Sequence, residues 1–341
     1  MQRTNYFIGI DVSADTFSAS TISNPENVIF FQDDVSNTYD GFEQLNQQII
    51  QHKIPAKETI ICLEATGVYA EKLCYYFASK SYRLWLAAPH KVNHATKDSP
   101  RKNDHLDAQR IAEYAYRYID KLNLWQPRAE ILEQIKVLLS TREHISEQLI
   151  GNQNALKALS RKYYQTPLAN KVYQETITKI KEHIKEIDKE IKSLIDKDNS
   201  FHQYVNLAKS VPGVGLLLAA NLLVLTNGFT ENVNYKKIAS YAGICPYEQK
   251  SGSSLNKKPR SRRCGPHKLR KLLYLASLSV RTHNLAFKKY FLRRVQEGKP
   301  NRLILNNIAN KILKLACAVI NSKISFINNY QSVNPMFLKT A

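Results

Sequence analysis

The sequence predicts an α/β domain at the N-terminus, then a long helical hairpin, then a mostly α-helical C-terminal domain. Three observations predict this order. Short apolar runs alternate with amphipathic segments up to about residue 90, apolar residues then recur with helical spacing from 131 to 194, and later apolar segments have helical length. We therefore expect domains at 1–125, 126–204 and 205–325, followed by a tail at 326–341.

Within the first domain, apolar runs bounded by turn residues predict strands, and apolar residues three or four apart predict helices. The expected strands are 6–23 (two strands), 28–31, 58–64 and 82–88, and the expected helices are 38–51, 69–80 and one starting near 102. The order of three strands, helix, strand, helix, strand, helix is that of the ribonuclease-H-like fold, a mixed sheet flanked by helices.

The middle region carries a narrow apolar seam. Its positions alternate between spacings of four and three, and most of them hold Ile or Leu: 131, 135, 138, 142, 145, 149, 152, 156 and 159. After a break at Pro167 the pattern returns from Ile177 to Leu194. Such a seam predicts an antiparallel hairpin or an intermolecular coiled coil, acting as a spacer and dimerisation arm. A nucleic-acid contact on its basic outer face is the alternative.

The C-terminal domain opens with a glycine-containing loop, Val211-Pro-Gly-Val-Gly215, before an apolar helix that runs to about 225. This loop resembles that of a helix-hairpin-helix, in which Gly213 and Gly215 would expose N–H groups to a nucleic-acid phosphate. An ordinary helix N-terminus is the alternative. Further helices are expected at 235–243, 267–282, 285–297 and 301–324, with a loop over 245–266.

Four acids lie where predicted strands end and a predicted helix begins. Asp11 ends the first apolar run, Glu64 ends another, and Asp104 and Asp107 lie one helical turn apart. Parallel neighbouring strands bring such acids together, and carboxylates that close repel one another unless cations lie between them. Mg²⁺ prefers oxygen ligands, and two such ions act on phosphodiesters. We therefore predict a pair of Mg²⁺ ions at these four residues, although each acid alone could be a surface residue or a helix cap.

The formal net charge is +20 and the pI is about 9.6, which favours a polyanionic partner such as nucleic acid. The densest basic cluster lies between 250 and 271, and comprises Lys250, Lys257, Lys258, Arg260, Arg262, Arg263, Lys268, Arg270 and Lys271. The five cysteines include no Cys-x-x-Cys pair, which argues against zinc and suits reduced thiols. No signal peptide and no apolar run of membrane-spanning length is apparent, so we expect a cytoplasmic protein.

Two candidate nucleophiles lie in this basic region. Ser251 begins the run Ser-Gly-Ser-Ser254, but no Gly-x-Ser-x-Gly elbow surrounds it, so a hydrolase triad is not predicted. His267 and Arg270 match the His-x-x-Arg element of tyrosine recombinases, with Tyr274, Tyr290 and Tyr330 downstream. That second interpretation leaves the N-terminal acids without a role.

Several motifs together resemble one family. Ile8-Gly-Ile-Asp11, Leu63-Glu-Ala-Thr-Gly67 and Lys102-Asn-Asp-His-Leu-Asp-Ala108 resemble the DEDD domain of the one-ten insertion-sequence transposases, which include the Piv and MooV invertases. Ser210-Val-Pro-Gly-Val-Gly215, Tyr241-Ala-Gly-Ile244 and Ser251-Gly252 resemble the C-terminal domain of that family.

The resemblance implies a RuvC-like N-terminal domain that holds Mg²⁺, or Mn²⁺ as a substitute, on Asp11, Glu64, Asp104 and Asp107. It implies that Ser251 becomes covalently joined to DNA, with Ser253 or Ser254 as substitutes because the serine run differs from the family pattern. It also implies excision and insertion of an element, a structured noncoding bridge RNA as guide, and dimers that assemble into tetramers in a prokaryotic, nucleoid-associated setting. A junction-resolving nuclease that uses water, a site-specific DNA invertase and a non-catalytic nucleic-acid-binding protein stay open as alternatives.

Overall fold

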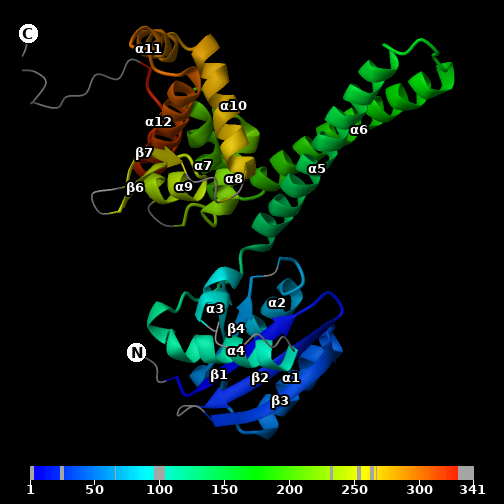
Figure 1. The fold of residues 1–341 in the computed structure, drawn as a ribbon, viewed down its shortest axis with the longest axis vertical. Coiled ribbons are helices and arrows are strands. Elements are labelled where there is room, and N and C mark those ends of the chain that lie inside the picture. Colours follow the sequence, from blue (N-terminus) through cyan, green and yellow to red (C-terminus); the bar gives the residue numbers. More distant parts are fainter. Residues whose placement is uncertain are drawn as a thin grey trace, which may run out of the picture. The chain divides into compact units, whose positions relative to one another are not determined.

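The structure is a computed structural model that describes residues 4–23, 27–65, 67–95, 104–230, 233–251, 255–261, 265 and 267–328. The chain divides into two compact units, residues 1–127 and residues 128–341, and each unit is described by itself (Figure 1). The α5–α6 hairpin, which comprises α5 (Glu130–Leu159) and α6 (Pro167–Asp196), belongs to the second unit.

The first unit is built on one five-stranded sheet with strand order β3-β2-β1-β4-β5. The strands are β1 (Tyr6–Val12), β2 (Thr16–Ser23), β3 (Asn27–Ser36), β4 (Thr59–Glu64) and β5 (Arg83–Ala87). The first three pair antiparallel, while β4 runs parallel to both β1 and β5. This mixed sheet confirms the predicted α/β class and the predicted order of its strands, while a short helix at Pro89–Ala95 was not predicted. The third strand is longer than expected because its second half, from Gln32, is polar and gives no apolar signal.

Helices cover both faces of this sheet. The inward side chains of one face, including Ile8, Ile10 and Leu63, pack on α1 (Tyr39–Gln51) and α2 (Glu71–Ser79). The opposite face, including Phe7 and Cys62, packs on α4 (Asp104–Arg117) and on α3 (Pro89–Ala95). Alternate residues of a strand point to opposite faces, so odd-numbered residues of β1 and even-numbered residues of β4 face α4. Two short 3-10 helices, Ala56–Glu58 and Ile119–Lys121, complete the unit.

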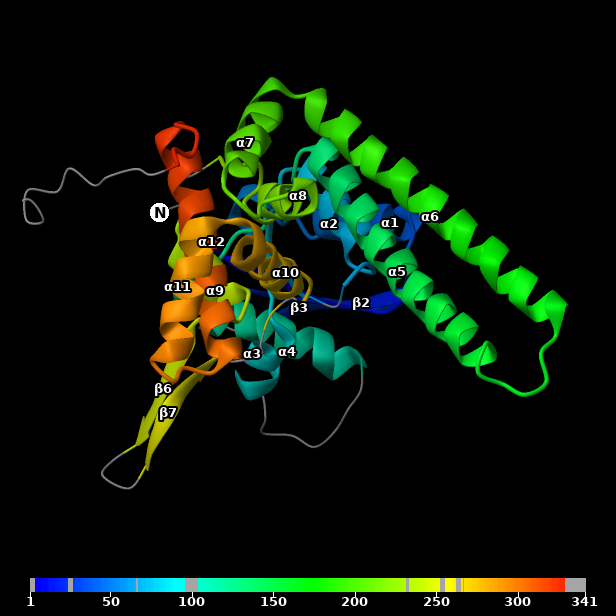
Figure 2. The same cartoon turned by 90° about the horizontal axis from the view of Figure 1, so that it is seen from above.

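The second unit is mostly helical, as predicted. Beyond the hairpin it comprises α7 (Asn199–Ser210), α8 (Leu216–Leu225), α9 (Tyr235–Tyr241), α10 (His267–His283), α11 (Leu285–Gln296) and α12 (Asn301–Ser322). The base of the hairpin joins the core of these helices through Leu132 and Ile135 of α5 and Ile191 and Leu194 of α6. Both views show the rest of the hairpin projecting beyond the helical body of this unit (Figure 1, Figure 2).

Helix α12 lies at the centre of the second core. It is long and apolar enough to cross a membrane, which the sequence analysis did not anticipate. However, ten of its residues are buried against the other helices, including Ile304, Ile308, Ile312 and Leu313. Its apolar composition is therefore accounted for by its place as a core helix.

A two-stranded antiparallel sheet replaces most of the loop predicted over 245–266. It consists of β6 (Pro246–Ser251) and β7 (Leu255–Ser261), with Ser251 paired to Leu255. The prediction was wrong here because the strands are polar and basic, and they contain none of the apolar alternation by which strands are recognised. Residues 252–254, which include Ser253 and Ser254, lie outside the described residues, as do Arg262, Arg263 and Tyr330.

Candidate functional site

Two of the predicted acids lie at the carboxyl ends of neighbouring parallel strands of the first unit: Asp11 is the next-to-last residue of β1, and Glu64 is the last residue of β4. In the register of β1 and β4, Ile10 lies beside Leu63, so Asp11 and Glu64 are the next residues along each strand. Neighbouring strands lie about 4.8 Å apart. Because both residues follow the alternation of the face that packs on α4, their carboxylates emerge on the same side of the sheet.

The approach of α4 to the sheet depends on Gly9. A Cβ on Gly9 would lie 2.2 Å from both the Ala108 oxygen and the Ala112 nitrogen, so only glycine allows the helix backbone to lie this close. Gly9 is two residues before Asp11 on the same face, and Asp107 immediately precedes Ala108. This close contact therefore brings Asp107 toward the carboxyl ends of β1 and β4, where Asp11 and Glu64 lie.

The charges of Asp11 and Asp107 act on the Glu64 carboxyl. Burial raises the pKa of the Glu64 carboxyl above its usual value, and the negative charges of Asp11 and Asp107 raise it further. Repulsion of this kind means that the three acids share one small region. Hard cations such as Mg²⁺ prefer oxygen ligands and remove such repulsion, so the donor set fits a divalent ion.

The other side of this site is formed by α4. Asp107 accepts a hydrogen bond of 2.7 Å from the Arg110 guanidinium one turn later, and the two side chains form an ion pair. Asp104 is the first residue of α4, one turn before Asp107 on the helix. The helix start at Asp104 was expected from the sequence.

The predicted nucleophile lies in the second unit. Ser251 is the last residue of β6, where the β6–β7 hairpin turns. Lys257, Lys258 and Arg260 all lie on β7, so their backbone positions follow the same hairpin.

Two basic residues predicted to bind nucleic acid have contacts within their own chain. The Lys268 ammonium donates a hydrogen bond of 2.5 Å to the Leu139 carbonyl oxygen of α5, and burial lowers the pKa of Lys268. Arg270 donates from Nε to the Ala242 carbonyl oxygen at 2.9 Å. Both side chains therefore tie α10 to neighbouring elements, which gives each of them a structural role.

The loop between α7 and α8 contains two glycines with different surroundings. Gly213 has a φ of +84°, and a Cβ there would lie 2.6 Å from Val280 Cγ1, so packing on α10 accounts for this glycine. Gly215 precedes the first turn of α8, and a Cβ added to it would meet no atom within 4 Å. The space beside Gly215 is thus open to a ligand.

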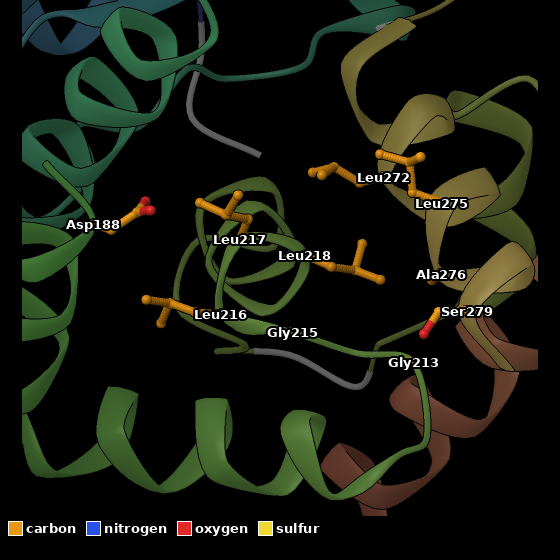
Figure 3. Close-up of a pocket in the computed structure, with 10 residues that line it drawn as sticks. All are labelled: Asp188, Gly213, Gly215, Leu216, Leu217, Leu218, Leu272, Leu275, Ala276 and Ser279. Atoms are coloured by element: carbon orange, nitrogen blue, oxygen red, sulfur yellow. The ribbon is translucent and has the colours of Figure 1, made fainter. Parts of the chain in front are cut away.

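A cleft of about 380 Å³ adjoins this loop, and Figure 3 shows the residues that line it. Leucines of α8 and α10, including Leu217 and Leu272, make up half of its lining residues. The one acid in the lining, Asp188, pairs with Arg142 through two hydrogen bonds of 2.5 and 3.0 Å. An apolar wall is unsuited to phosphate, so any phosphate contact here would have to use the backbone N–H groups at the start of α8.

A cluster that the sequence analysis missed joins α5 to α10. Glu143, Glu147 and His267 each offer one ligand atom, and these atoms lie within 4.8 Å of one another. Lys271 pairs with Glu143 at 2.7 Å and so already neutralises one acid, which makes this cluster an ion-pair network between the helices. The only sequence signal was the i, i+4 spacing of the two glutamates, because His267 lies far along the chain.

Comparisons with known proteins agree over both units. A transposase family model of the IS110 DEDD type matches residues 8–165, and a model described as "Transposase IS116/IS110/IS902 family" matches residues 205–292. The chain is 29% identical to the pilin gene-inverting proteins of Moraxella lacunata and Moraxella bovis, over 94% of this chain and 97% of each relative. It is also 26% identical to an uncharacterised 43.6 kDa protein of insertion element IS110 from Streptomyces coelicolor, over 42% of this chain and 35% of that relative.

Proposed function

Since this chain belongs to the IS116/IS110/IS902 family of transposases, we propose that it recombines DNA with a divalent-metal site on Asp11, Glu64, Asp104 and Asp107. The observation that carries the proposal is the placement of Asp11 and Glu64 at matching positions of the parallel strands β1 and β4, with α4 and its Asp107 packed closely against β1. The raised pKa of Glu64, to which the charges of Asp11 and Asp107 contribute, agrees with this placement. Membership of the family implies DNA recombinase activity, and the coupled acids supply a reason for it to need a cation.

The four acids would hold Mg²⁺, or Mn²⁺ in its place. A bound divalent ion supplies positive charge that stabilises a phosphodiester as its charge develops during cleavage. Asp11 and Glu64, held by neighbouring strands, would fix the position of the site, while the Asp107 ion pair with Arg110 would orient the carboxylate that comes from α4. The raised pKa of Glu64 makes its affinity for a cation sensitive to acid, since a protonated carboxyl is a poor ligand.

Ser251 is the proposed nucleophile. Its Oγ would attack a backbone phosphorus, forming a phosphoserine link while the bond from phosphorus to the 3′ oxygen breaks and the 3′ hydroxyl takes up a proton. The link keeps the energy of the broken bond, so strands can be rejoined without a nucleotide cofactor. Ser253 and Ser254 are the substitutes. Lys257, Lys258, Arg260, Arg262 and Arg263 would hold phosphates near this serine.

DNA inversion is a second candidate activity. It is favoured by the similarity to the pilin gene-inverting proteins, which extends over nearly the whole of both chains. Excision with insertion and inversion share the same cleavage and rejoining steps, and differ in which pairs of ends are exchanged. We also propose that a bridge RNA guides these exchanges and that dimers, joined through the α5–α6 hairpin, assemble into tetramers.

One experiment tests the metal site and the nucleophile together. Recombination of a plasmid that carries the element and its target is measured for the wild type, Asp11→Ala and Ser251→Ala, with Asp15→Asn as the control. Activity should fall at least about a hundredfold for the first two variants and stay near wild type for the control. The wild type should also leave a covalent protein–DNA adduct that Ser251→Ala lacks. Full activity of Asp11→Ala would refute the metal site.

Sequencing of nucleic acid that copurifies with the protein tests the guide. A structured RNA encoded next to the gene should be enriched over total cellular RNA.

In the adduct experiment, a covalent protein–DNA adduct that persists in Ser251→Ala would show that Ser251 is not the nucleophile and would make Ser253 or Ser254 the candidate.

A further inference from the structure

The far end of the α5–α6 hairpin exposes two adjacent aromatic rings. Tyr163 and Tyr164 lie in the connection between the helices, and 92% and 87% of their surfaces are exposed. Their rings meet edge to face, with centroids 5.0 Å apart and planes at 90°. Exposing two neighbouring large rings costs free energy in water, so a surface that keeps them usually has a partner. Because each ring has an exposed face, each can stack on a planar group.

The connection that carries these rings is ordered by hydrogen bonds. The amides of Arg161 and Lys162 donate to carbonyl oxygens in the last turn of α5, at 3.2 and 3.0 Å. The Gln165 side chain donates to the Ser160 carbonyl oxygen at 3.2 Å and closes the turn from the other side. The rings are therefore presented from a defined turn rather than from a long loop, which lowers the entropy lost when they bind a partner.

The charge around the rings has a single sign. Between Glu147 and Glu175 the sequence contains no acid, and its four charged residues are all basic: Lys157, Arg161, Lys162 and Lys171. We call residues 157–172, which include these four and both tyrosines, the hairpin tip. Basic side chains are favoured near the carboxyl end of a helix, so the end of α5 accounts for some of these charges, but it does not account for the exposed rings.

We propose that the hairpin tip binds unpaired nucleotides, with bases stacked on Tyr163 and Tyr164 and phosphates held by the surrounding basic side chains. Aromatic stacking together with positive charge is the usual way in which proteins hold single strands without reading their sequence. Paired bases in a duplex hide their faces and cannot stack in this way. The inference rests on the proposed function, because it presupposes a nucleic-acid substrate, and it assigns a second contact to that substrate.

A second copy of the chain is a weaker candidate for this surface. Two tips with four basic residues and no acid would repel each other, whereas nucleic acid is complementary in charge. The tip also has two exposed apolar side chains near the start of α6, Leu168 at 68% and Val172 at 51%. These two residues provide a matched control, because a protein partner would use them and a stacked base would not.

The test measures binding of full-length protein to a fluorescein-labelled single strand of about 20 nucleotides, as oligo-dT and as oligo-U, and to a duplex of equal length. The variants are Y163A/Y164A, the ring-preserving Y163F/Y164F and the control L168A/V172A. Loss of stacking should weaken single-strand affinity at least about fivefold in the alanine variant. The phenylalanine variant, the control and the duplex affinity should stay within about twofold of wild type. Because both rings are almost fully exposed, the melting temperatures of Y163A/Y164A and Y163F/Y164F should match that of wild type.

Photocrosslinking supplies a second measurement. A single strand with 5-iodouracil should attach to the peptide that contains Tyr163 and Tyr164. Unchanged single-strand affinity of Y163A/Y164A would overturn the inference. Equal loss in L168A/V172A, accompanied by a smaller oligomer in size-exclusion chromatography, would assign the tip to a protein contact instead. Single-strand affinity measured with EDTA in place of divalent ions should still depend on Tyr163 and Tyr164, so failure of the metal site and failure of the tip are distinguishable.

Discussion

At the scale of single residues, Glu64 lies in surroundings that disfavour its charged form. Its neighbours include two other carboxylates, which raise its pKa together with burial. Both causes act against ionisation, whereas a neighbouring cation would favour it. The fold therefore tolerates a local repulsion that a divalent ion would remove.

The pH dependence of stability follows from this shift. Since the folded pKa of Glu64 lies above its unfolded value of 4.5, the folded state binds the proton more tightly, and stability falls as pH rises through the interval between the two values. Glu64→Gln removes the charge, so in metal-free protein at neutral pH it should melt at a higher temperature than wild type. Below pH 4.5 the two should melt alike. Thermal melting across pH measures the difference.

The same variant reports on the cation. Added Mg²⁺ should raise the melting temperature of wild type and should raise that of Glu64→Gln less, because one ligand is lost. Asp15→Asn is the matched control, since this exposed acid lies in the turn after β1 and should leave the response to Mg²⁺ intact. A pH profile of Glu64→Gln parallel to that of wild type would contradict the account of this carboxyl.

At this scale, the places of Asp11 and Glu64 near strand ends and of Asp104 at a helix start could be predicted from the sequence, because strand ends and helix starts are local features. Their role as metal ligands stays a prediction. It could not predict that Lys268 and Arg270 bond to carbonyl oxygens of α5 and of the segment after α9, because those partners are distant in sequence. The same limit hid the proximity of His267 to Glu143 and Glu147. In a strongly basic chain, the sequence does not indicate whether a positive side chain within a cluster faces solvent or bonds to backbone carbonyl oxygens elsewhere in the chain.

At the scale of elements, the packing of α4 on β1 determines whether the acids meet. Gly9→Ala would place a methyl carbon 2.2 Å from backbone atoms of α4, which cannot rotate away, so the helix must shift. We expect a loss of about 2–3 kcal/mol in the free energy of unfolding. The shift should also weaken Mg²⁺ binding, because Asp107 moves with α4. Denaturant unfolding and the Mg²⁺-induced rise in melting temperature measure the two effects.

Gly151→Ala is the control, and its effect should have the opposite sign. Gly151 lies inside α5, where an added Cβ would meet no atom within 4 Å. Alanine should stabilise that helix by about 0.5–1 kcal/mol because it loses less backbone entropy on folding. If both substitutions had the same small effect, close approach of α4 would not be what requires glycine at position 9.

Elements with a strong apolar period were predictable from the sequence, and elements without one were not. The sheet of the first unit and the paired helices α5 and α6 follow from runs and spacings of apolar residues. The hairpin of β6 and β7 was missed because Lys257, Pro259 and Arg260 indicate a basic loop. Its strands pair through backbone hydrogen bonds and need no apolar face, so they could not be predicted from a pattern of side chains.

At the scale of the whole chain, the excess of positive over negative charge lies in one unit. Residues 1–127 contain 13 basic and 15 acidic residues, a formal charge of −2, whereas residues 128–341 contain 36 basic and 14 acidic residues, a formal charge of +22. The unit that carries Asp11 and Glu64 is therefore close to neutral, and we expect the attraction for nucleic acid to come mainly from the other unit. Each unit also has its own buried core, so we expect cation binding by the first unit and nucleic-acid binding by the second unit to be separable.

Expression of the two units as separate proteins tests this division. Residues 1–127 should fold, show the Mg²⁺-induced rise in melting temperature and bind DNA weakly. Residues 128–341 should fold, bind DNA and RNA, and show no response to Mg²⁺ in melting. Binding by the second unit should fall about a thousandfold or more between ~50 and ~200 mM salt if about six phosphates are engaged, because each contact releases counterions. Binding is measured by fluorescence anisotropy across salt concentrations.

The full-length protein is the reference for both halves. Its salt slope should equal that of residues 128–341, since the first unit adds no net positive charge. A steeper slope in the full-length protein would mean that the first unit contributes phosphate contacts of its own, from basic side chains whose effect is cancelled in the net charge. Recombination should be absent from either half alone and from a mixture of the two halves at low concentration. The proposed acids lie in one unit and the proposed serine lies in the other. Only the intact chain keeps the two units at a high effective concentration relative to each other.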